Sequence, residues 1–148
     1  MTGLLLDTNV ISELRKPISR MNPGVREWAA TLDTAAAFLS VISVSELSTW
    51  AASVRARGDA VQAALLDAWL DGHVLAHFAD RVLPIDVEVA VTAGRLQVPD
   101  PRDYRDSFIA ATALVHELTV VTRNVADFAP TGVSLVNPFD PAPAQPRG

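Results

Sequence analysis

The segment GLLLDTNVISELRKP (residues 3–17) joins an apolar run to a helical pattern through three polar residues. The run at 3–6 does not alternate apolar and polar side chains, which is typical of a strand buried on both faces. Asp7 stands at the junction, where it can cap the following helix or form one wall of an ion site. Thr8 or Asn9 can fill the capping role equally well, so this segment alone leaves both interpretations open.

Composition indicates one globular domain, because 49% of the 148 residues are hydrophobic and only 20% are charged. The chain has no cysteine, which excludes disulfides, thiolate zinc sites and cysteine nucleophiles and suits a reducing cytosol. No apolar stretch approaches the ~20 residues that a transmembrane helix needs. We therefore expect a soluble cytoplasmic protein that makes no membrane contact.

The formal net charge of −5 argues against non-specific coating of DNA, which requires a surplus of basic residues. Nucleic acid remains possible as a substrate, because a bound divalent cation reverses the local charge of a carboxylate pocket.

Further apolar runs at 36–42 and 118–122, and a weaker one at 133–136, predict additional buried strands. Strands that alternate with helices indicate an α/β fold with a mostly parallel sheet and helices on both faces. We expect this domain to span 1–138 and a proline-rich tail to span 139–148. Helical spacing is seen at Leu47–Val54, at Val61–Trp69, from Val89 to Leu96 behind a predicted Asp86 cap, and at 104–117.

Polar side chains follow three of the predicted strands. Asp7 comes directly after the first strand, Glu46 lies on the helix after the second, and Arg123 and Asn124 follow LTVVT. In parallel sheets, ligands bind beyond the carboxyl ends of the strands. These groups are therefore predicted to gather at one edge of the sheet.

Two of the acids also have a structural interpretation. SVSE (43–46) has the form of a capping box, with Ser43 as N-cap and Glu46 bonding back to it. Asp106 is a favourable acid in the first turn of a helix, although Asp103 is nearer to the start and can do the same.

Asn124 can open a turn or cap a short helix together with Asp127, or it can hold a water or an ion through its amide oxygen. The spacing of His73 and His77 raises the possibility of a zinc site. A metalloprotease-type motif, however, requires a glutamate directly after the first histidine, and Val74 stands there. We interpret the two histidines as part of a polar helix end.

Asp7, Glu46 and Asp106 together predict a cation site, because carboxylates in proximity repel one another unless a cation lies among them. Oxygen donors without Cys or His favour Mg²⁺, with Mn²⁺ as a possible substitute. Such an ion suits hydrolysis of a phosphodiester. Five basic residues near these acids are candidates to hold the substrate backbone: Arg15, Lys16, Arg102, Arg105 and Arg123.

Four motifs carry a family resemblance: LLDTNVISEL at 5–14, SVSEL at 43–47, RDSFIAATA at 105–113 and VTRNVADF at 121–128. Together they resemble a PIN domain, and more narrowly the VapC-type toxins of bacterial toxin–antitoxin modules. The resemblance extends to about residue 138, with the motifs in the family's order. It implies a three-layer α/β/α sandwich, which agrees with the pattern of strands and helices.

The resemblance also implies an activity and partners. It implies a Mg²⁺-dependent endoribonuclease that leaves 5′-phosphate and 3′-hydroxyl ends, is held inactive by a cognate antitoxin, and commonly forms a homodimer. Asp7, Glu46 and Asp106 match the family's acidic metal-site residues, and Asn9 matches the asparagine that supports the first aspartate. Asn124 departs from the pattern, since many PIN domains have a fourth acid there. We therefore do not assume a two-metal mechanism.

Two other classes of function were compared with this one. A haloacid-dehalogenase-type phosphatase requires a second acid two residues after Asp7, where Asn9 stands, and a lysine late in the chain, whereas Lys16 is the only lysine. The alternative that stays open is a catalytically weak module that acts mainly as the partner-binding half of an antitoxin repressor complex.

Overall fold

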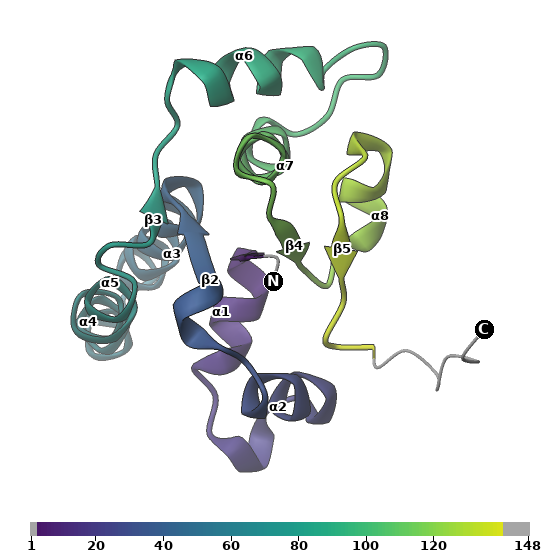
Figure 1. Cartoon of the computed structure of the whole chain (residues 1–148). Coiled ribbons are helices and arrows are strands. Elements are labelled where there is room, and N and C mark those ends of the chain that lie inside the picture. Colours follow the sequence, from purple (N-terminus) through teal and green to yellow (C-terminus); the bar gives the residue numbers. More distant parts are fainter. Residues whose placement is uncertain (1–2, 141–148) are drawn as a thin grey trace.

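A computed structural model describes residues 3–140 of the chain. Five short strands form one sheet in the order β3-β2-β1-β4-β5, and every pair of neighbours is parallel (Figure 1). The predicted parallel sheet is therefore confirmed. The strands are β1 (Leu4–Leu6), β2 (Ala37–Ser40), β3 (Val82–Leu83), β4 (Thr119–Val121) and β5 (Leu135–Val136).

Helices connect all of these strands. The α-helices are α1 (Thr8–Leu14), α2 (Pro23–Ala30), α3 (Val41–Ala56), α4 (Ala60–Trp69), α5 (Leu75–His77), α6 (Val87–Arg95), α7 (Tyr104–His116) and α8 (Val125–Phe128). A π-helical turn, η3 (Leu70–Val74), joins α4 to α5, and short 3₁₀ turns lie at Ile18–Arg20, Thr34–Ala36 and Ala129–Thr131.

The sheet is buried on both faces. Successive residues of a strand point to opposite sides, so neighbouring side chains of β1 enter different core clusters. Leu5 of β1 packs with Val120 and with Ile109 of α7 in one core cluster. Its neighbour Leu6 packs on the other face with Val10 of α1 in a second cluster. Helices therefore cover both faces of the sheet, which confirms the predicted α/β/α sandwich.

The boundary between the second strand and its helix differs from the prediction. The strand expected over 36–42 ends at Ser40, because the Ser40 hydroxyl accepts a 3.0 Å hydrogen bond from the Ile42 N–H and starts α3 there. Ser43 lies inside the helix and is buried. The interpretation of SVSE as a capping box is therefore wrong.

Helix α4 lies where the sequence predicts a helix, but it packs through other residues. Val61 and Leu65, which carry the apolar spacing, are 75% and 54% exposed. Ala63 and Leu66 are buried instead, because they face the α3 residues Ala51 and Val54 in a small core cluster of their own.

Helix α6 agrees with the prediction, since Asp86 caps it by accepting a 2.9 Å hydrogen bond from the Val89 N–H. The predicted tail at 139–148 lies outside the described residues except for Phe139 and Asp140. Phe139 packs against the α1 side of the core. Within residues 3–140, no helix is both long and apolar enough to cross a membrane.

The strand order decides where a site can form. From β1 the sheet grows through β2 and β3 on one side and through β4 and β5 on the other. The connections after β1 and β4 therefore diverge, and they leave a crevice at the carboxyl ends of these two strands. Asp7 follows β1 directly, and Thr122 follows β4.

Candidate functional site

All five sequence-predicted site residues line one cavity at the carboxyl end of the sheet. The cavity has a volume of about 280 Å³. Its residues come from four separate segments: the start of α1, the second turn of α3, the first turn of α7 and the loop after β4. The lining consists of Asp7, Thr8, Asn9, Ser12, Glu46, Asp106 and Asn124.

Asp7 is held by hydrogen bonds to both oxygens of its carboxylate and is 5% exposed. Oδ1 accepts a 2.8 Å bond from the Thr8 N–H. Oδ2 accepts from the Thr122 hydroxyl at 2.8 Å and from the Asn9 amide at 3.1 Å. Asp7 thus occupies the N-cap position of α1, but its carboxylate is fixed mainly by side chains around the cavity.

Thr122 is a fully buried residue that connects β4 to the rest of the site. Besides donating to Asp7, its hydroxyl oxygen accepts from the Asn124 N–H at 2.9 Å and from the Asn9 amide at 3.3 Å. Asn9 in turn accepts a 3.1 Å bond from the backbone N–H of Arg123 through its Oδ1. One hydroxyl and one amide therefore set the positions of Asp7 and of the loop that carries Asn124.

Glu46 is oriented from across the cavity by the first turn of α1. The Thr8 hydroxyl donates a 2.7 Å hydrogen bond to Oε1 of Glu46, and the Ser43 hydroxyl lies 3.0 Å from the same Thr8 oxygen. Neither of the predicted capping-box bonds is formed. The carboxylate therefore belongs to the cavity and not to the end of its own helix.

Asp106 lies in the first turn of α7, and Asp103 is the N-cap of that helix. Asp103 accepts from the Arg105 N–H at 2.8 Å, as a capping side chain does. Asp106 is therefore not needed for capping, which leaves its carboxylate available to the cavity.

The electrostatics of the cavity are those of crowded carboxylates. Burial raises the pKa of Asp106 to about 6, with further contributions from Asp103, Asp7, Asp127 and Glu46. Burial also raises the pKa of Asp7, although the hydrogen bonds from Thr122 and Thr8 oppose that shift. A proton that stays on one of these carboxylates reduces the repulsion between their negative charges. A divalent cation among them would reduce this repulsion further.

The donor set fits a small, hard cation. The cavity offers oxygen donors only, from three carboxylates and from the side-chain oxygens of Asn9 and Asn124. Among residues 3–140, no group of three or more His, Cys, Asp or Glu side chains is arranged to hold a metal ion by itself, so part of the shell would have to come from amide oxygens or water. Mg²⁺ suits such a site, because it is usually bound through one or two carboxylates and keeps several of its waters.

The five basic residues predicted to hold substrate have different positions. The Arg15 guanidinium lies over the rings of Trp50 and Trp69, 5.9 and 5.7 Å from their centroids. Arg102 donates through Nε to the Leu96 carbonyl at 2.6 Å. These two side chains support the fold.

Of the other three basic residues, two form ion pairs and one lies over an aromatic ring. Lys16 pairs with Glu13 at 3.0 Å, and the Arg123 guanidinium lies 4.1 Å from the centroid of Phe139. Arg105 forms an ion pair with Glu46, a residue of the cavity, at 3.7 Å.

Asp127 and the two threonines were not identified as site residues from the sequence. Asn124 opens a turn through the bond from the Asp127 N–H to its carbonyl, as predicted, but its side chain does not cap α8. The Asp127 carboxylate is close enough to raise the pKa of both Asp7 and Asp106. The sequence feature that could have identified Asp127 is its position three residues after Asn124, but we interpreted that spacing as part of a turn or helix cap.

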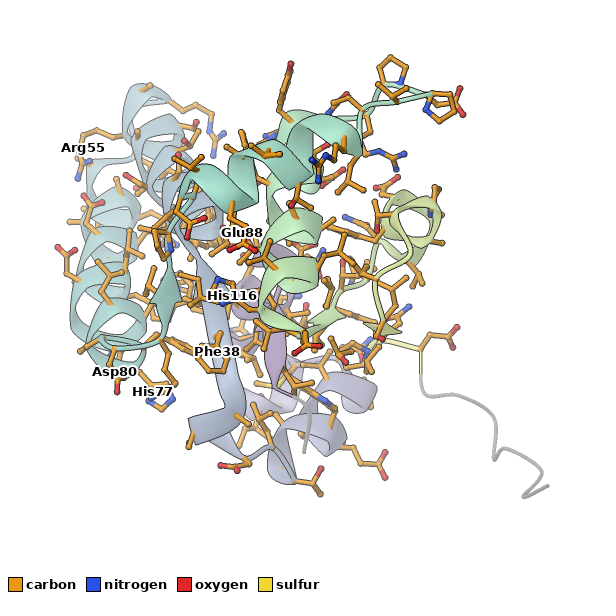
Figure 2. All side chains as sticks on the ribbon, turned by 45° about the horizontal axis from the view of Figure 1, so that its top comes forward. Phe38, Arg55, His77, Asp80, Glu88 and His116 are labelled. Atoms are coloured by element: carbon orange, nitrogen blue, oxygen red, sulfur yellow. The ribbon has the colours of Figure 1, made fainter. Side chains whose placement is uncertain are left out.

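The histidines lie elsewhere. His73 and His77 line a separate apolar groove between α1 and the η3–α5 segment. Asp80 pairs with Arg81 at 3.3 Å. His77 and Asp80 point outward from the end of this helical segment (Figure 2).

Comparison with known proteins agrees with this architecture. The PIN domain family matches residues 4–130. The chain belongs to the PIN domain family. One curated relative is the VapC ribonuclease Y4jK of Sinorhizobium fredii, which is 33% identical over 94% of this chain and 99% of its own length. Another is the toxin FitB of Neisseria gonorrhoeae, which is 34% identical over 92% of this chain and 98% of its own length. A solved structure, FitAB bound to the IR36 DNA fragment, matches with a TM-score of 0.84 and 31% identity over 96% of this chain and 99% of that one.

Proposed function

We propose that this PIN domain is a Mg²⁺-dependent endoribonuclease and the toxin of a toxin–antitoxin pair. One observation carries the proposal: Asp7, Glu46 and Asp106 meet in one cavity at the switch point of the sheet. The names of its relatives, a VapC ribonuclease and the toxin FitB, support the same activity and role.

In this mechanism Asp7 and Asp106 would hold the ion, and Glu46 would complete the shell or orient the attacking water. When bound, Mg²⁺ supplies an activated water and stabilises the negative charge that develops on the phosphodiester. Asn124 contributes its amide oxygen from the side of the cavity. Because Asn124 replaces a carboxylate, we propose one ion and not two.

The hydrogen bonds of Asp7 indicate which of its oxygens serves the ion. Each carboxylate oxygen has two lone pairs. Oδ2 already accepts two bonds, from Thr122 and Asn9, whereas Oδ1 accepts only one, from the Thr8 N–H. Oδ1 therefore keeps a free lone pair, and Thr122 and Asn9 act as positioning residues that hold the other oxygen still.

We propose single-stranded or loop RNA as the substrate, because its splayed bases and flexible backbone can enter an open cavity. The whole chain has more acids than bases, 17 to 12, so its net charge does not attract RNA. The bound ion and a few local arginines would therefore provide the attraction for the RNA phosphates.

The partner that we propose is a cognate antitoxin, as in the FitAB complex, and the state of the toxin is a homodimer. An apolar groove of about 130 Å³ between α1 and η3–α5 is suited to an apolar segment of such a partner. It is lined mainly by Ile11, Leu14, Trp69, Val74 and Phe78. A charge at exposed His77, as in His77→Glu, should weaken co-purification with the co-expressed antitoxin and leave melting unchanged.

The deciding experiment is cleavage of total bacterial RNA by the purified, partner-free protein, in Mg²⁺ and in EDTA. Asp7→Asn and Asp106→Asn are the site variants, and Asp67→Asn is the matched control on the distant helix α4. Discrete fragments that need Mg²⁺ and vanish in both site variants support the proposal. Folded protein that cleaves nothing in any condition would favour the partner-binding module instead, and cleavage that survives both variants would indicate a contaminant.

A further inference from the structure

Arg105 links the cap of α7 to the carboxylates of the cavity. Its Nε and Nη2 donate to the two oxygens of Asp103 at 3.1 and 2.9 Å, while Nη1 lies 3.7 Å from Oε2 of Glu46. The guanidinium thus binds one carboxylate with two hydrogen bonds and reaches a second with its remaining nitrogen.

Among residues 3–140, Arg105 is the one basic side chain in an ion pair with a carboxylate of the cavity. Its side chain is 62% exposed, whereas that of Glu46 is 27% exposed. Packing therefore does not fix the tip of Arg105. Its position comes from the two bonds to Asp103, which do not depend on Glu46.

The two oxygens of Glu46 have different partners. Oε1 is bound by the Thr8 hydroxyl, and Oε2 is the oxygen that Arg105 approaches. Oε1 keeps one lone pair beside the bond from Thr8, whereas Oε2 accepts no hydrogen bond among residues 3–140 and is the more available oxygen, so a cation that uses Oε2 would meet the positive charge of Arg105 there. Two positive charges around one carboxylate oxygen repel each other, so the ion and Nη1 each weaken the binding of the other to Oε2.

We propose that Arg105 competes with the divalent cation for Oε2 of Glu46, so that it acts as the counterion of the metal-free cavity and withdraws when the metal binds. The bonds to Asp103 hold the arginine at the mouth of the cavity during this exchange. This inference rests on the proposed metal dependence but concerns the strength of metal binding. Arg105 is in this sense a positioning residue, since it acts through Glu46.

The test measures binding of Mn²⁺ to the metal-free protein by electron paramagnetic resonance, without RNA. Arg105→Gln should bind Mn²⁺ about threefold to tenfold more tightly than the wild type, because a repelling charge is removed from the shell. Arg105→Lys keeps the charge and should restore affinity close to that of the wild type. The gain should shrink in high salt, since the pair is exposed to solvent.

Arg57→Gln is the matched control. It removes the same charge at the C-terminal end of the helix that carries Glu46, about 16 Å further along at 1.5 Å per residue. Its affinity for Mn²⁺ should stay within about twofold of the wild type, because that distance exceeds the screening length of physiological salt. Melting temperatures of all variants establish that the proteins are folded.

The outcomes separate this inference from the proposed function. Equal or weaker binding by folded Arg105→Gln would overturn the competition and leave metal dependence intact. An equal gain in Arg57→Gln would also overturn it, since net charge alone would then explain the effect. If neither the wild type nor Arg105→Gln binds Mn²⁺, both proposals are overturned. Tighter binding by Arg105→Gln alone, reversed by lysine, supports the inference.

Discussion

The Thr8 hydroxyl donates a 2.7 Å hydrogen bond to Oε1 of Glu46, across a sequence separation of 38 residues. A hydroxyl group has a single hydrogen to donate. The Ser43 hydroxyl, 3.0 Å from the Thr8 oxygen, must therefore be the donor in that second contact. The result is a directed chain from Ser43 through Thr8 to Glu46, which orients the carboxylate before any ligand is present.

Thr8→Val should slow cleavage without unfolding the protein. Valine keeps the shape of the side chain but cannot hold Glu46, and a hydrogen bond to a charged group contributes about 1.5 kcal/mol, or about tenfold in rate. The measurement is the cleavage rate at saturating Mg²⁺. Thr8→Ser retains the hydroxyl and should stay near the wild type; a rate in Thr8→Val equal to that of Thr8→Ser would show that this bond has no catalytic role.

Thr122→Val should destabilise the fold. The hydroxyl of Thr122 is fully buried, and its removal takes a partner from Asp7, from Asn9 and from the Asn124 N–H. Because three partners lose their bond, we expect the free energy of unfolding to fall by about 2–3 kcal/mol in urea titrations with EDTA. Thr122→Ser, which loses only a methyl group, should lose about 1 kcal/mol. The prediction fails if the two variants unfold at the same urea concentration.

Asp106→Asn should stabilise the metal-free protein at neutral pH. The pKa of Asp106 is raised to about 6 from 3.8, so the folded state holds this proton more tightly than the unfolded state. Its contribution is favourable below about pH 4 and is lost as the pH rises through about 6. In EDTA at pH 7 the variant should melt about 2–4 °C higher, for a gain on the order of 1 kcal/mol after allowance for solvent.

Added Mg²⁺ should reverse that order. The ion stabilises a protein that binds it, so the wild type should gain melting temperature and Asp106→Asn should gain little. Thermal melting at pH 5 and pH 7, with EDTA or with Mg²⁺, tests both statements. A variant that melts below the wild type in EDTA at pH 7 would contradict the assigned repulsion.

Glu13 should be a stability residue remote from the chemistry. Its buried carboxylate accepts the Asn22 N–H at 2.8 Å and pairs with Lys16, which ties α1 to the start of α2. Burial alone raises its pKa, but the Asn22 N–H and Lys16 outweigh it and lower the pKa below 4.5. Glu13→Ala should cost about 2 kcal/mol through the unpaired N–H, and Lys16→Met under about 1 kcal/mol because Lys16 is 53% exposed.

The pH dependence of the Glu13 contribution has the opposite sign to that of Asp106. A lowered pKa means that the stabilisation is present above about 4.5 and fades as the pH falls through the folded value. The stability difference between the wild type and Glu13→Gln should therefore shrink between about pH 5 and pH 3. A difference that stays constant over this range would assign the effect to packing.

The sheet could be predicted from the sequence because its signals are local. Buried parallel strands appear in the sequence as apolar runs. Leu5 and Leu6 can therefore be recognised as strand residues without knowing which strands pair with them. Strand β3 was not predicted because its two residues, Val82 and Leu83, stand between Arg81 and Pro84, whereas the apolar run of the equally short β5 begins earlier, at Val133. Helix α2 was not predicted either, although Val25 is buried and Trp28, one turn on, packs partly against the core.

The boundary of α3 depends on a choice between two serines. Both Ser40 and Ser43 are good N-cap residues, and local sequence favours Ser43 because Glu46 follows it at the right spacing. Tertiary structure decides otherwise, since Glu46 accepts from Thr8 and is not available to its own helix end.

The acids of the site were easier to find than the residues that hold them. Carboxylates just beyond strand ends are conspicuous in an apolar sequence, whereas a threonine is ordinary in a strand. Thr122 acts on Asp7 from a position 115 residues away. Only the pairing of β1 with β4 brings the two together, and that pairing leaves no mark at either position.

The central place of β1 has a consequence for the growing polypeptide. β1 is synthesised before the other four strands, yet one of its two neighbours, β4, follows only after β2 and β3. Until β4 docks, Asp7 lacks its hydrogen bond from Thr122. The helix that bears Asp106, α7, also lacks its packing contact with Val120. Contacts of such long range form late in folding. A nascent chain that lacks β4 therefore holds no assembled cavity, and the candidate site forms only after β4 has been made.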